Sequence, residues 1–402
     1  MASDDIWIIG VSMTKFMRYK DKDLIDLASE AALDALDDAG VTIQDMDILA
    51  SGNLAEAGGG VGQRIQKQIG QTGIPVYNVA NACATGATAF RVVHTAIKAG
   101  EATMGLAIGS EQMGKAGMLG AAGRARSDKK EYVPSGRYGG VMGTEGILGT
   151  NMMPGTFAQT GMEYAYQNDG VGFEQFAKVA EKNHAHSVLN PLAQYQKAFG
   201  LDEIMAGEMI AYPNTLLMCC PTGDGAAAAV VVSGERLASM PAEVRKRAIK
   251  VSASVLTSDP YVDGCQVQFD VNTLTRRAAD QAYAQSGVDP KDLDLVELHD
   301  CFATAELCHY DNLRLCEPGG AGEWIDKRGP WRDGEIPVNV SGGLLSKGHP
   351  LGATGIANIF EVSTHLRGEA GDRQIEGAKV GLTHVIGLGS ACAVHILEKA
   401  AS

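Results

Sequence analysis

An internal duplication constrains the fold of this chain more than any other feature of its sequence. Residues 31–49 and 278–296 share one pattern of alanines, a glycine, an aspartate-containing turn and an apolar run, at a constant separation of 247 residues. Each copy predicts an amphipathic helix that stops at Gly40 or Gly287 and is followed by a buried strand. The two halves of the chain are therefore expected to fold alike.

Three further echoes extend the duplication. Residues 84–86 and 353–355 both read Ala-Thr-Gly and open helical patterns, and the other echoes pair strand patterns. They pair residues 105–107 with 381–383, and 224–232 with 388–397. Each half reads as a β-α-β-α-β-β unit, which predicts an α/β fold with mostly parallel sheets and helices on both faces.

The stretch from 114 to 215 interrupts this pattern and has no counterpart in the second half. We expect residues 1–113 and 216–247 to form the N-terminal half, 114–215 an inserted loop domain, and 248–402 the C-terminal half. Insertions on the loops of a rigid scaffold often form the wall of a substrate pocket.

Composition limits the class of protein. The chain has 402 residues, 20% of them charged, and a net charge of −14, which argues against nucleic-acid binding. No apolar run reaches the roughly 18 residues of a membrane span. The first residues lack the shape of a signal peptide, and the last residues carry no peroxisomal address. The eight cysteines include no CxxC pair, so we expect reduced thiols, no metal site and a cytoplasmic location.

Cys83 is the predicted nucleophile. It lies in Asn-Ala-Cys-Ala-Thr-Gly, directly before a helical pattern. The N–H groups and dipole of a helix start lower a thiol pKa, and the same N–H groups could donate to an oxyanion. The alternative is a small buried apolar residue.

His349 is the predicted partner of this thiol. It lies in Gly-His-Pro between two glycine-rich runs, and glycines let a backbone approach a ligand closely. It could take the Cys83 proton as a base, or polarise a thioester carbonyl with its N–H. An ordinary loop histidine is the alternative.

His299 and Cys301 follow an apolar run that predicts a strand. Strand alternation would place both on one side, and open α/β sheets bind ligands beyond the carboxyl ends of their strands. A packed histidine and a packed cysteine are the alternative. Cys392 aligns with Ala228 in the last echo, inside an unbroken apolar strand, so we expect a structural role for it.

Weaker signals point to substrate contacts. Cys220 precedes a glycine-rich strand entry and could line a pocket. Arg124, Arg126 and Arg137 belong to the densest basic cluster of this acidic chain. That cluster predicts either a solvated loop or a site for a nucleotide phosphate.

Together these segments resemble the thiolase superfamily, and within it the sterol-carrier-protein-2 type. The resemblance covers nearly the whole chain and rests on residues 81–86, 183–187, 190–191, 221–227, 299–302 and 348–350. It implies β-α-β-α-β-α-β-β halves layered α-β-α-β-α, with an inserted loop domain. Met162 falls where that loop domain lines the pantetheine tunnel of the family.

The resemblance also implies a reaction. A thiolase (acetyl-CoA C-acyltransferase) cleaves or forms 3-ketoacyl-CoA, here in fatty-acid or steroid side-chain metabolism, through an acyl group held on Cys83. His349 would activate Cys83, and Cys301 would protonate the departing enolate. His299 and His349 would form one oxyanion hole, and the N–H groups of Cys83 and Gly387 the other. Most thiolases carry their second cysteine in a C-terminal Cys-x-Gly loop, which here reads Val-Ile-Gly.

The family comparison further implies no permanently bound cofactor, with CoA and acyl-CoA as substrates. It implies a homodimer or a tetramer, and a stand-alone thiolase body without a sterol-carrier domain. Two alternatives stay open. One is a retro-aldol lyase that acts on steroid side-chain CoA esters with a small OB-fold partner protein. The other is a non-catalytic binder of acyl-CoA or lipid.

Overall fold

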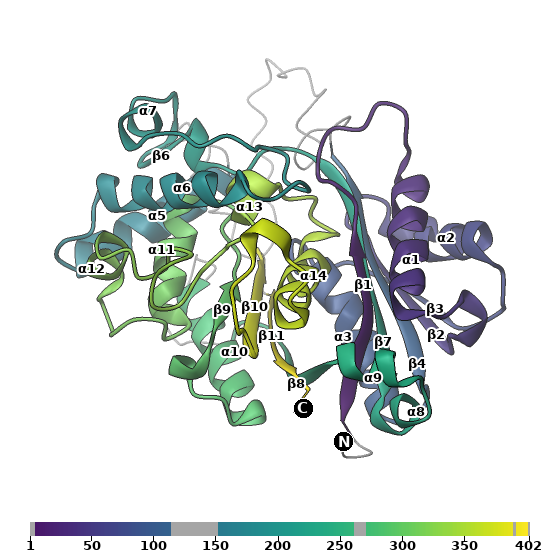
Figure 1. Ribbon diagram of the computed structural model, residues 1–402. Helices are drawn as coiled ribbons and strands as arrows, with labels where there is room; N and C mark the ends of the chain where they lie inside the picture. Colours follow the sequence, from purple (N-terminus) through teal and green to yellow (C-terminus); the bar gives the residue numbers. More distant parts are fainter. Residues whose placement is uncertain (1–4, 114–151, 261–270, 389–390, 401–402) are drawn as a thin grey trace.

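The computed structural model describes residues 5–113, 152–260, 271–388 and 391–400 (Figure 1). The N-terminal half contains β1 (Ile6–Met13), α1 (Leu24–Ala39), β2 (Ile48–Gly52), α2 (Val61–Ile69), β3 (Val76–Val79), α3 (Thr85–Lys98), β4 (Met104–Gln112) and β7 (Asp224–Ser233). Between β4 and β7 lie α5 (Met152–Gln167), α6 (Phe173–Ser187), α7 (Leu201–Met205), β5 (Met209–Ala211) and β6 (Asn214–Thr215).

The short helices α8 (Gly234–Ala238) and α9 (Ala242–Arg247) lead into the second half. It contains β8 (Ile249–Thr257), α10 (Val271–Ser286), β9 (Leu295–Glu297), α11 (Ala303–Asn312), α12 (Ala321–Asp326), α13 (Gly343–Lys347), α14 (Thr354–Arg367), β10 (Val380–Gly387) and β11 (Ala391–Lys399). The helices α1 and α10 are related by the separation of 247 residues at both ends, and each is followed by a glycine with positive φ, at Gly40 and Gly287. The duplication predicted from sequence is thus present in the structure.

Nine of the strands form one sheet in the order β3-β2-β4-β7-β1-β8-β11-β10-β9, and β5 and β6 pair separately. Strands β2, β3 and β4 are parallel, as are β9 and β10, and the other neighbours are antiparallel. The two halves join through β1 and β8, where only Trp7 with Lys250 and Ile8 with Ile249 pair. From the join outward, β1-β7-β4-β2 and β8-β11-β10-β9 follow the same order, which confirms the predicted α/β class. The prediction of mostly parallel sheets is wrong, because the central strands β1, β7, β8 and β11 are antiparallel to all of their neighbours, so five of the eight neighbouring pairs are antiparallel.

Helices cover the sheet in layers (Figure 1). Helices α1 and α2 pack on the outer face of the N-terminal strands, and α10 packs on the outer face of the C-terminal strands. Helices α3 and α14 lie between the two sets of strands, and α14 contacts strands of both halves. Strand β1 serves two cores by alternation: Ile8 packs toward α3 and α14, whereas Ile9 packs toward α1.

The second half departs from the expected pattern at its third strand. In the described residues, Val338 forms only an isolated parallel bridge with Val296 where the first half has β3. Pro337 has no N–H to extend a ladder, and Asn339 turns the chain away with φ +52°. The full eight-element pattern is therefore present only in the first half.

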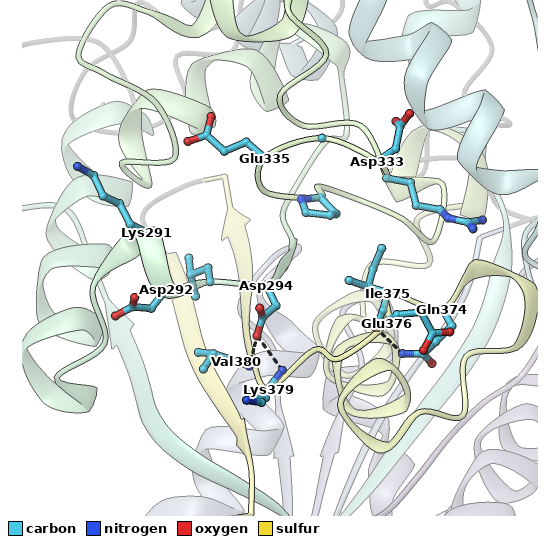
Figure 2. A pocket seen from close by; sticks show the side chains of 14 residues that line it. Lys291, Asp292, Asp294, Asp333, Glu335, Gln374, Ile375, Glu376, Lys379 and Val380 are labelled. Carbon is cyan, nitrogen blue, oxygen red and sulfur yellow. Dashed lines mark hydrogen bonds between the residues drawn. The ribbon is translucent and has the colours of Figure 1, made fainter.

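The two halves also repeat a turn interaction. Asp47 accepts hydrogen bonds from the N–H groups of Thr103 (2.7 Å) and Met104 (3.1 Å) at the start of β4. Its counterpart Asp294 accepts from Lys379 (2.7 Å) and Val380 (2.9 Å) at the start of β10, as Figure 2 shows. The surface hollow drawn there lies at the amino end of β10, whereas Gly387 ends that strand at its opposite, carboxyl end.

The predicted alignment of residues 224–232 with residues 388–397 is wrong by two residues. Gly105 pairs with Val231 in the first half and Gly381 with Leu397 in the second, so β7 and β11 are separated by 166 residues rather than 164. Cys392 therefore corresponds to Ala226 and not to Ala228. A shift of two residues keeps the same face of the strand. Cys392 is fully buried, and its thiol lies next to Thr275 of α10 in the outer core.

The amino ends of α3 and α14 cross with almost no room between them. A Cβ on Gly86 would lie 2.6 Å from the carbonyl oxygen of Gly352, and one on Gly355 would lie 2.4 Å from the Ala87 nitrogen. The glycine-rich run 352–355 after His349 thus lets the backbones of the two halves touch, whereas Gly343 of the run before His349 lies against Asp300. The sequence predicts instead that these glycines let the backbone approach a ligand.

We predict that Gly355→Ala lowers the free energy of unfolding by about 1–3 kcal/mol, because the backbone of α3 must move away from the new methyl group. Gly58→Ala is the control, since a Cβ there meets nothing within 4 Å. Urea unfolding of both variants measures the effect. Equal stability of the two variants would contradict this account of the crossing.

Candidate active site

The predicted site residues converge where parallel strands end. Cys83 follows β3, His299 and Cys301 follow β9, and Gly387 ends β10. His349 lies in the loop before α14, whose amino end crosses α3. Both halves therefore contribute to one location, beyond the carboxyl ends of the strands where open α/β sheets bind ligands.

Cys83 is held in a constrained turn. The preceding residue, Ala82, has φ +47°, and the hydroxyl of Thr85 donates to its carbonyl oxygen at 2.6 Å. The Cys83 side chain is 2% exposed. Burial raises the pKa of this thiol to about 12, and the N–H groups of Cys83 and Leu388 lower it by less. The prediction that the helix start makes Cys83 a thiolate is thus wrong for the resting protein.

His299 and His349 face each other beside this sulfur. Their Nε2 atoms are 3.4 Å apart, and the rings are inclined at 67°. The Cys83 Sγ and one ring nitrogen of each histidine all lie within 4.8 Å of one another. The structure therefore brings together a thiol and two imidazoles, as the sequence predicts.

The hydrogen bonds of His349 determine its tautomer. Its Nδ1 lies 2.7 Å from the hydroxyl oxygen of Thr354, and that hydroxyl donates its own hydrogen to the Pro350 carbonyl at 2.9 Å. Nδ1 must then carry the proton of the ring, which leaves Nε2 as the acceptor that faces His299.

Burial keeps both rings neutral. It lowers the pKa of His299 to about 3, and it lowers the pKa of His349 well below 6.5 with help from His299 and Lys347. A neutral imidazole next to a neutral thiol is ready to accept its proton when a substrate arrives.

A thiol and two imidazoles are also donors that zinc binds. Among the residues that the structure describes, only Cys83, His299 and His349 form a group that could hold a metal ion. These are the same three side chains that the sequence assigns to thioester chemistry.

Cys301 lies beside a second buried thiol. The N–H of Cys220 donates to the Cys301 carbonyl at 3.0 Å, and burial raises the pKa of both thiols well above the usual range. A charge on Cys83 or Cys220 would raise the pKa of Cys301 further. Cys301 is therefore a neutral thiol that is available as a proton donor.

The expected strand alternation of His299 and Cys301 is wrong. Strand β9 ends at Glu297, and both residues lie in the loop that follows it. Their placement comes from the hydrogen bonds of that loop. Among these, Asp300 accepts from the N–H of Leu344 at 2.7 Å.

Gly387 packs directly against the loop of Cys83. A side chain at this position would lie 2.4 Å from the Asn81 carbonyl oxygen. The N–H that reaches the Cys83 sulfur belongs to the next residue, Leu388. Sequence reasoning missed Leu388, because a backbone donor leaves no trace in the side chain of its residue.

Helix α5 supplies an apolar wall that sequence reasoning did not assign. The Phe157 ring is fully buried, 6.1 Å from the His299 ring and stacked at 5.5 Å on Phe302. Met153 packs against the apolar cluster around Cys83, which includes Leu351. The spacing of four residues between Met153 and Phe157 was the available signal.

A buried carboxylate joins the site loops to the first half. Glu111 of β4 accepts hydrogen bonds from the N–H groups of Leu54 (2.9 Å), Ala55 (3.1 Å) and Gly352 (3.1 Å). It thereby links the loop after β2 to the loop that carries His349.

The structure adds little support to the predicted substrate contacts of Met162 and the three arginines. Met162 is 40% exposed on α5. Arg124, Arg126 and Arg137 lie outside the described residues. Among the described helices, none combines the length and the apolar character that a membrane crossing requires.

Comparison with family models matches both halves of the chain. Residues 6–204 match the family described as "Thiolase, N-terminal domain", and residues 266–399 match "Thiolase C-terminal domain-like". The chain is 38% identical to human sterol carrier protein 2 over 401 residues, which cover 98% of this chain and 72% of the relative. It is 36% identical to an acetyl-CoA acetyltransferase of Methanothermobacter thermautotrophicus, over 98% of this chain and all of the relative.

Solved structures share the fold. An Ltp2-ChsH2(DUF35) aldolase superposes with a TM-score of 0.81 at 22% identity, over 99% of each chain. Human mitochondrial 3-ketoacyl-CoA thiolase in complex with CoA superposes with a TM-score of 0.72 at 18% identity, over the full length of both chains.

The neutral thiol predicts the pH dependence of alkylation. Because the Cys83 pKa is about 12, its thiolate fraction should rise about tenfold per pH unit through neutrality, without a plateau. Iodoacetamide labelling at a series of pH values, with mass spectrometry of the peptide that contains Cys83, measures this slope. A rate that stays flat from mildly acidic to alkaline pH would indicate a preformed thiolate–imidazolium pair and contradict the neutral site.

Proposed function

The chain belongs to the thiolase family and is an acyltransferase, and on that premise we propose that it cleaves or forms 3-ketoacyl-CoA through an acyl group held on Cys83. One observation carries the proposal: the Cys83 sulfur and the ring nitrogens of His299 and His349 lie within 4.8 Å of one another. We place the reaction in fatty-acid or steroid side-chain metabolism.

The first step is attack by Cys83 on the 3-keto carbonyl. His349 Nε2 accepts the thiol proton as the sulfur–carbon bond forms, so the thiolate exists only when the electrophile is present. The N–H groups of Cys83 and of the Gly387–Leu388 segment are placed to donate to the resulting oxyanion. Burial, which raises the pKa of the free thiol, also strengthens these hydrogen bonds.

Carbon–carbon cleavage then releases the enolate of the shorter acyl-CoA. Its oxygen would accept hydrogen bonds from the Nε2–H groups of His299 and of the now protonated His349. The thiol of Cys301 gives its proton to the enolate carbon, and Cys301 becomes a thiolate. The tautomer of His349 derived above allows this change from acceptor to donor at one atom.

The second half of the cycle restores the enzyme. The Cys301 thiolate takes the proton of incoming CoA, and the CoA sulfur attacks the thioester on Cys83. Cys83 leaves and recovers the proton that His349 holds. Protons and electron pairs balance within the site, so no cofactor besides the CoA substrate is needed.

The substrate pocket is proposed for the segment between β4 and β7. The positions of Met153 and Phe157 over the site support a role of the proposed insertion, 114–215, as a pocket wall. We further propose the same division into two halves around that insertion, a homodimer or tetramer, and a cytoplasmic location. Cys220, Met162 and the three arginines remain proposed substrate contacts.

A retro-aldol lyase is the second candidate function. One specific observation favours it: the solved aldolase that shares this fold over 99% of both chains contains a DUF35 partner. The presence of Cys83 beside two imidazoles favours the thiolase, because a retro-aldol cleavage needs no acylated sulfur. Under the lyase proposal, a small OB-fold protein would bind this chain.

We predict that Cys83→Ala abolishes acyl transfer and keeps the thermal unfolding midpoint close to that of the unmodified chain. The reason is that the substitution removes the nucleophile from a small apolar cluster. Intact-mass spectrometry after addition of a 3-ketoacyl-CoA should show an acyl adduct on the unmodified chain only. Substrate binding without an adduct on the unmodified chain would indicate a non-catalytic binder.

We predict that Cys301→Ala loses carbon–carbon cleavage by at least about 100-fold while Cys83 is still acylated by a simple acyl-CoA, because only the cleavage step requires the proton donor. Cys392→Ala is the matched control, since that thiol is equally buried but lies under α10. Thiolysis assays of both variants test the assignment. Loss of thiolysis in Cys392→Ala with full activity in Cys301→Ala would overturn it.

A further inference from the structure

A buried ion pair connects the two segments that carry the facing histidines. Lys347 and Glu297 are both fully buried, and Lys347 Nζ lies 3.5 Å from Glu297 Oε2. Lys347 stands two residues before His349, and Glu297 stands two residues before His299. The pair therefore spans the same two chain segments whose Nε2 atoms meet at 3.4 Å.

Each member of the pair has a further polar partner. Glu297 accepts hydrogen bonds from the N–H and the hydroxyl of Ser341, at 3.1 and 2.6 Å. Lys347 Nζ lies 3.4 Å from Asn358 Oδ1. A buried ion pair adds little stability over apolar residues of the same volume, but loss of one partner leaves an unpaired charge. The ion pair therefore fixes the position of the His349 segment relative to the His299 segment.

A second tie acts at the other end of α13, the helix that leads to His349. Asp300 accepts hydrogen bonds from the N–H groups of Leu344 (2.7 Å) and Leu345 (3.2 Å). A Cβ on Gly343 would lie 2.1 Å from Asp300 Oδ2, so the absence of a side chain there permits this approach. Helix α13 is thus held at its start by Asp300 and at its end by Glu297, which flank His299 in sequence.

We propose that the Lys347–Glu297 pair is a positioning device for the reaction: it sets the approach of His349 to His299, and the Lys347 cation sets the charge environment of His349. This inference rests on the proposed function of the two histidines. Neither residue touches the substrate in this proposal, and both act through the imidazoles that they place.

The charges around the pair support the electrostatic part of the proposal. His299 and Lys347 both lower the pKa of His349. Lys347 itself is faced by Glu297 from β9 and by Glu361 from α14, and Glu361 is paired with Arg373 at 3.0 Å. A cation near His349 disfavours the imidazolium, so after each proton transfer His349 is driven to give the proton back.

The test uses Lys347→Met, Glu297→Gln and the double variant in the intact chain. We expect each single variant to lower kcat of thiolysis about 10- to 100-fold with little change in KM, because displaced catalytic groups lose rate rather than binding. The double variant should recover about 10-fold over the worse single variant, since it leaves no unpaired buried charge. It also serves in place of a single variant that does not fold.

The alkylation rate of Cys83 in the absence of substrate separates positioning from stability. If the pair only stabilised the fold, the two single variants would not change this rate in opposite directions. Lys347→Met should speed alkylation at neutral pH about 3- to 10-fold, because a more basic His349 stabilises the thiolate. Glu297→Gln leaves the Lys347 charge uncompensated and should slow alkylation. Arg367→Met is the control, because Arg367 forms an ion pair with the partly exposed Asp38 at 2.8 Å that involves neither histidine segment.

Two outcomes would overturn the positioning role. One is a loss of kcat in both single variants that is no larger than the loss in Arg367→Met at the same loss of thermal stability. The other is alkylation rates that do not shift in opposite directions. Opposite shifts in alkylation, combined with no thiolysis in the unmodified chain, would instead refute the proposed function and leave the electrostatic effect of the pair on His349 in place.

Discussion

The close approach of α3 and α14 is the constraint on which the rest of the structure depends. Both helices begin at the carboxyl ends of strands, and glycines at their crossing let the backbone of one half touch the other. Without that contact, Cys83 of the N-terminal half would not lie close to His349 of the C-terminal half. The crossing also directs the positive ends of two helix dipoles toward one location, where an oxyanion would form.

Burial keeps Cys83, His299 and His349 neutral in the resting site, although the helix dipoles favour a negative charge there. The thiol of Cys83 and both imidazoles are almost fully removed from water, and desolvation outweighs the nearby N–H groups in setting their pKa values. A neutral site avoids the free-energy cost of keeping a thiolate in an apolar cluster. In the proposed reaction, charge appears only together with the substrate oxygen to which the N–H groups would donate.

The sequence was sufficient for features that repeat or that have strict local requirements. The duplicated helices and their glycine stops follow from the repeat of 247 residues and from the positive φ that glycine accepts. The convergence of Cys83, His299 and His349 follows from the local sequences in which these residues lie. The missing third strand of the second half did not follow, because it depends on Pro337 and Asn339 at one point of the sheet edge. Nor did the Phe157 wall, because the four-residue spacing of Met153 and Phe157 predicts a shared helix face but not the partner of that face. The Leu388 N–H did not follow either, because a backbone donor leaves no trace in the side chain of its residue.

The duplication also explains why the site lies between the halves. The loops that precede α3 and α14 are equivalent, since both helices begin with Thr-Gly at a separation of 269 residues, so Cys83 corresponds to Gly352 and His349 to Ala80. The two equivalent loops meet at the helix crossing, where glycines of each loop contact the backbone of the other half. One loop carries Cys83, the proposed nucleophile, and the other carries His349, the proposed base. Each loop has a small residue, Ala80 or Gly352, at the position equivalent to the proposed reactive residue of the other loop. The buried charges around α13 belong to the half that supplies both histidines, including His349, whose protonation changes in the proposed reaction.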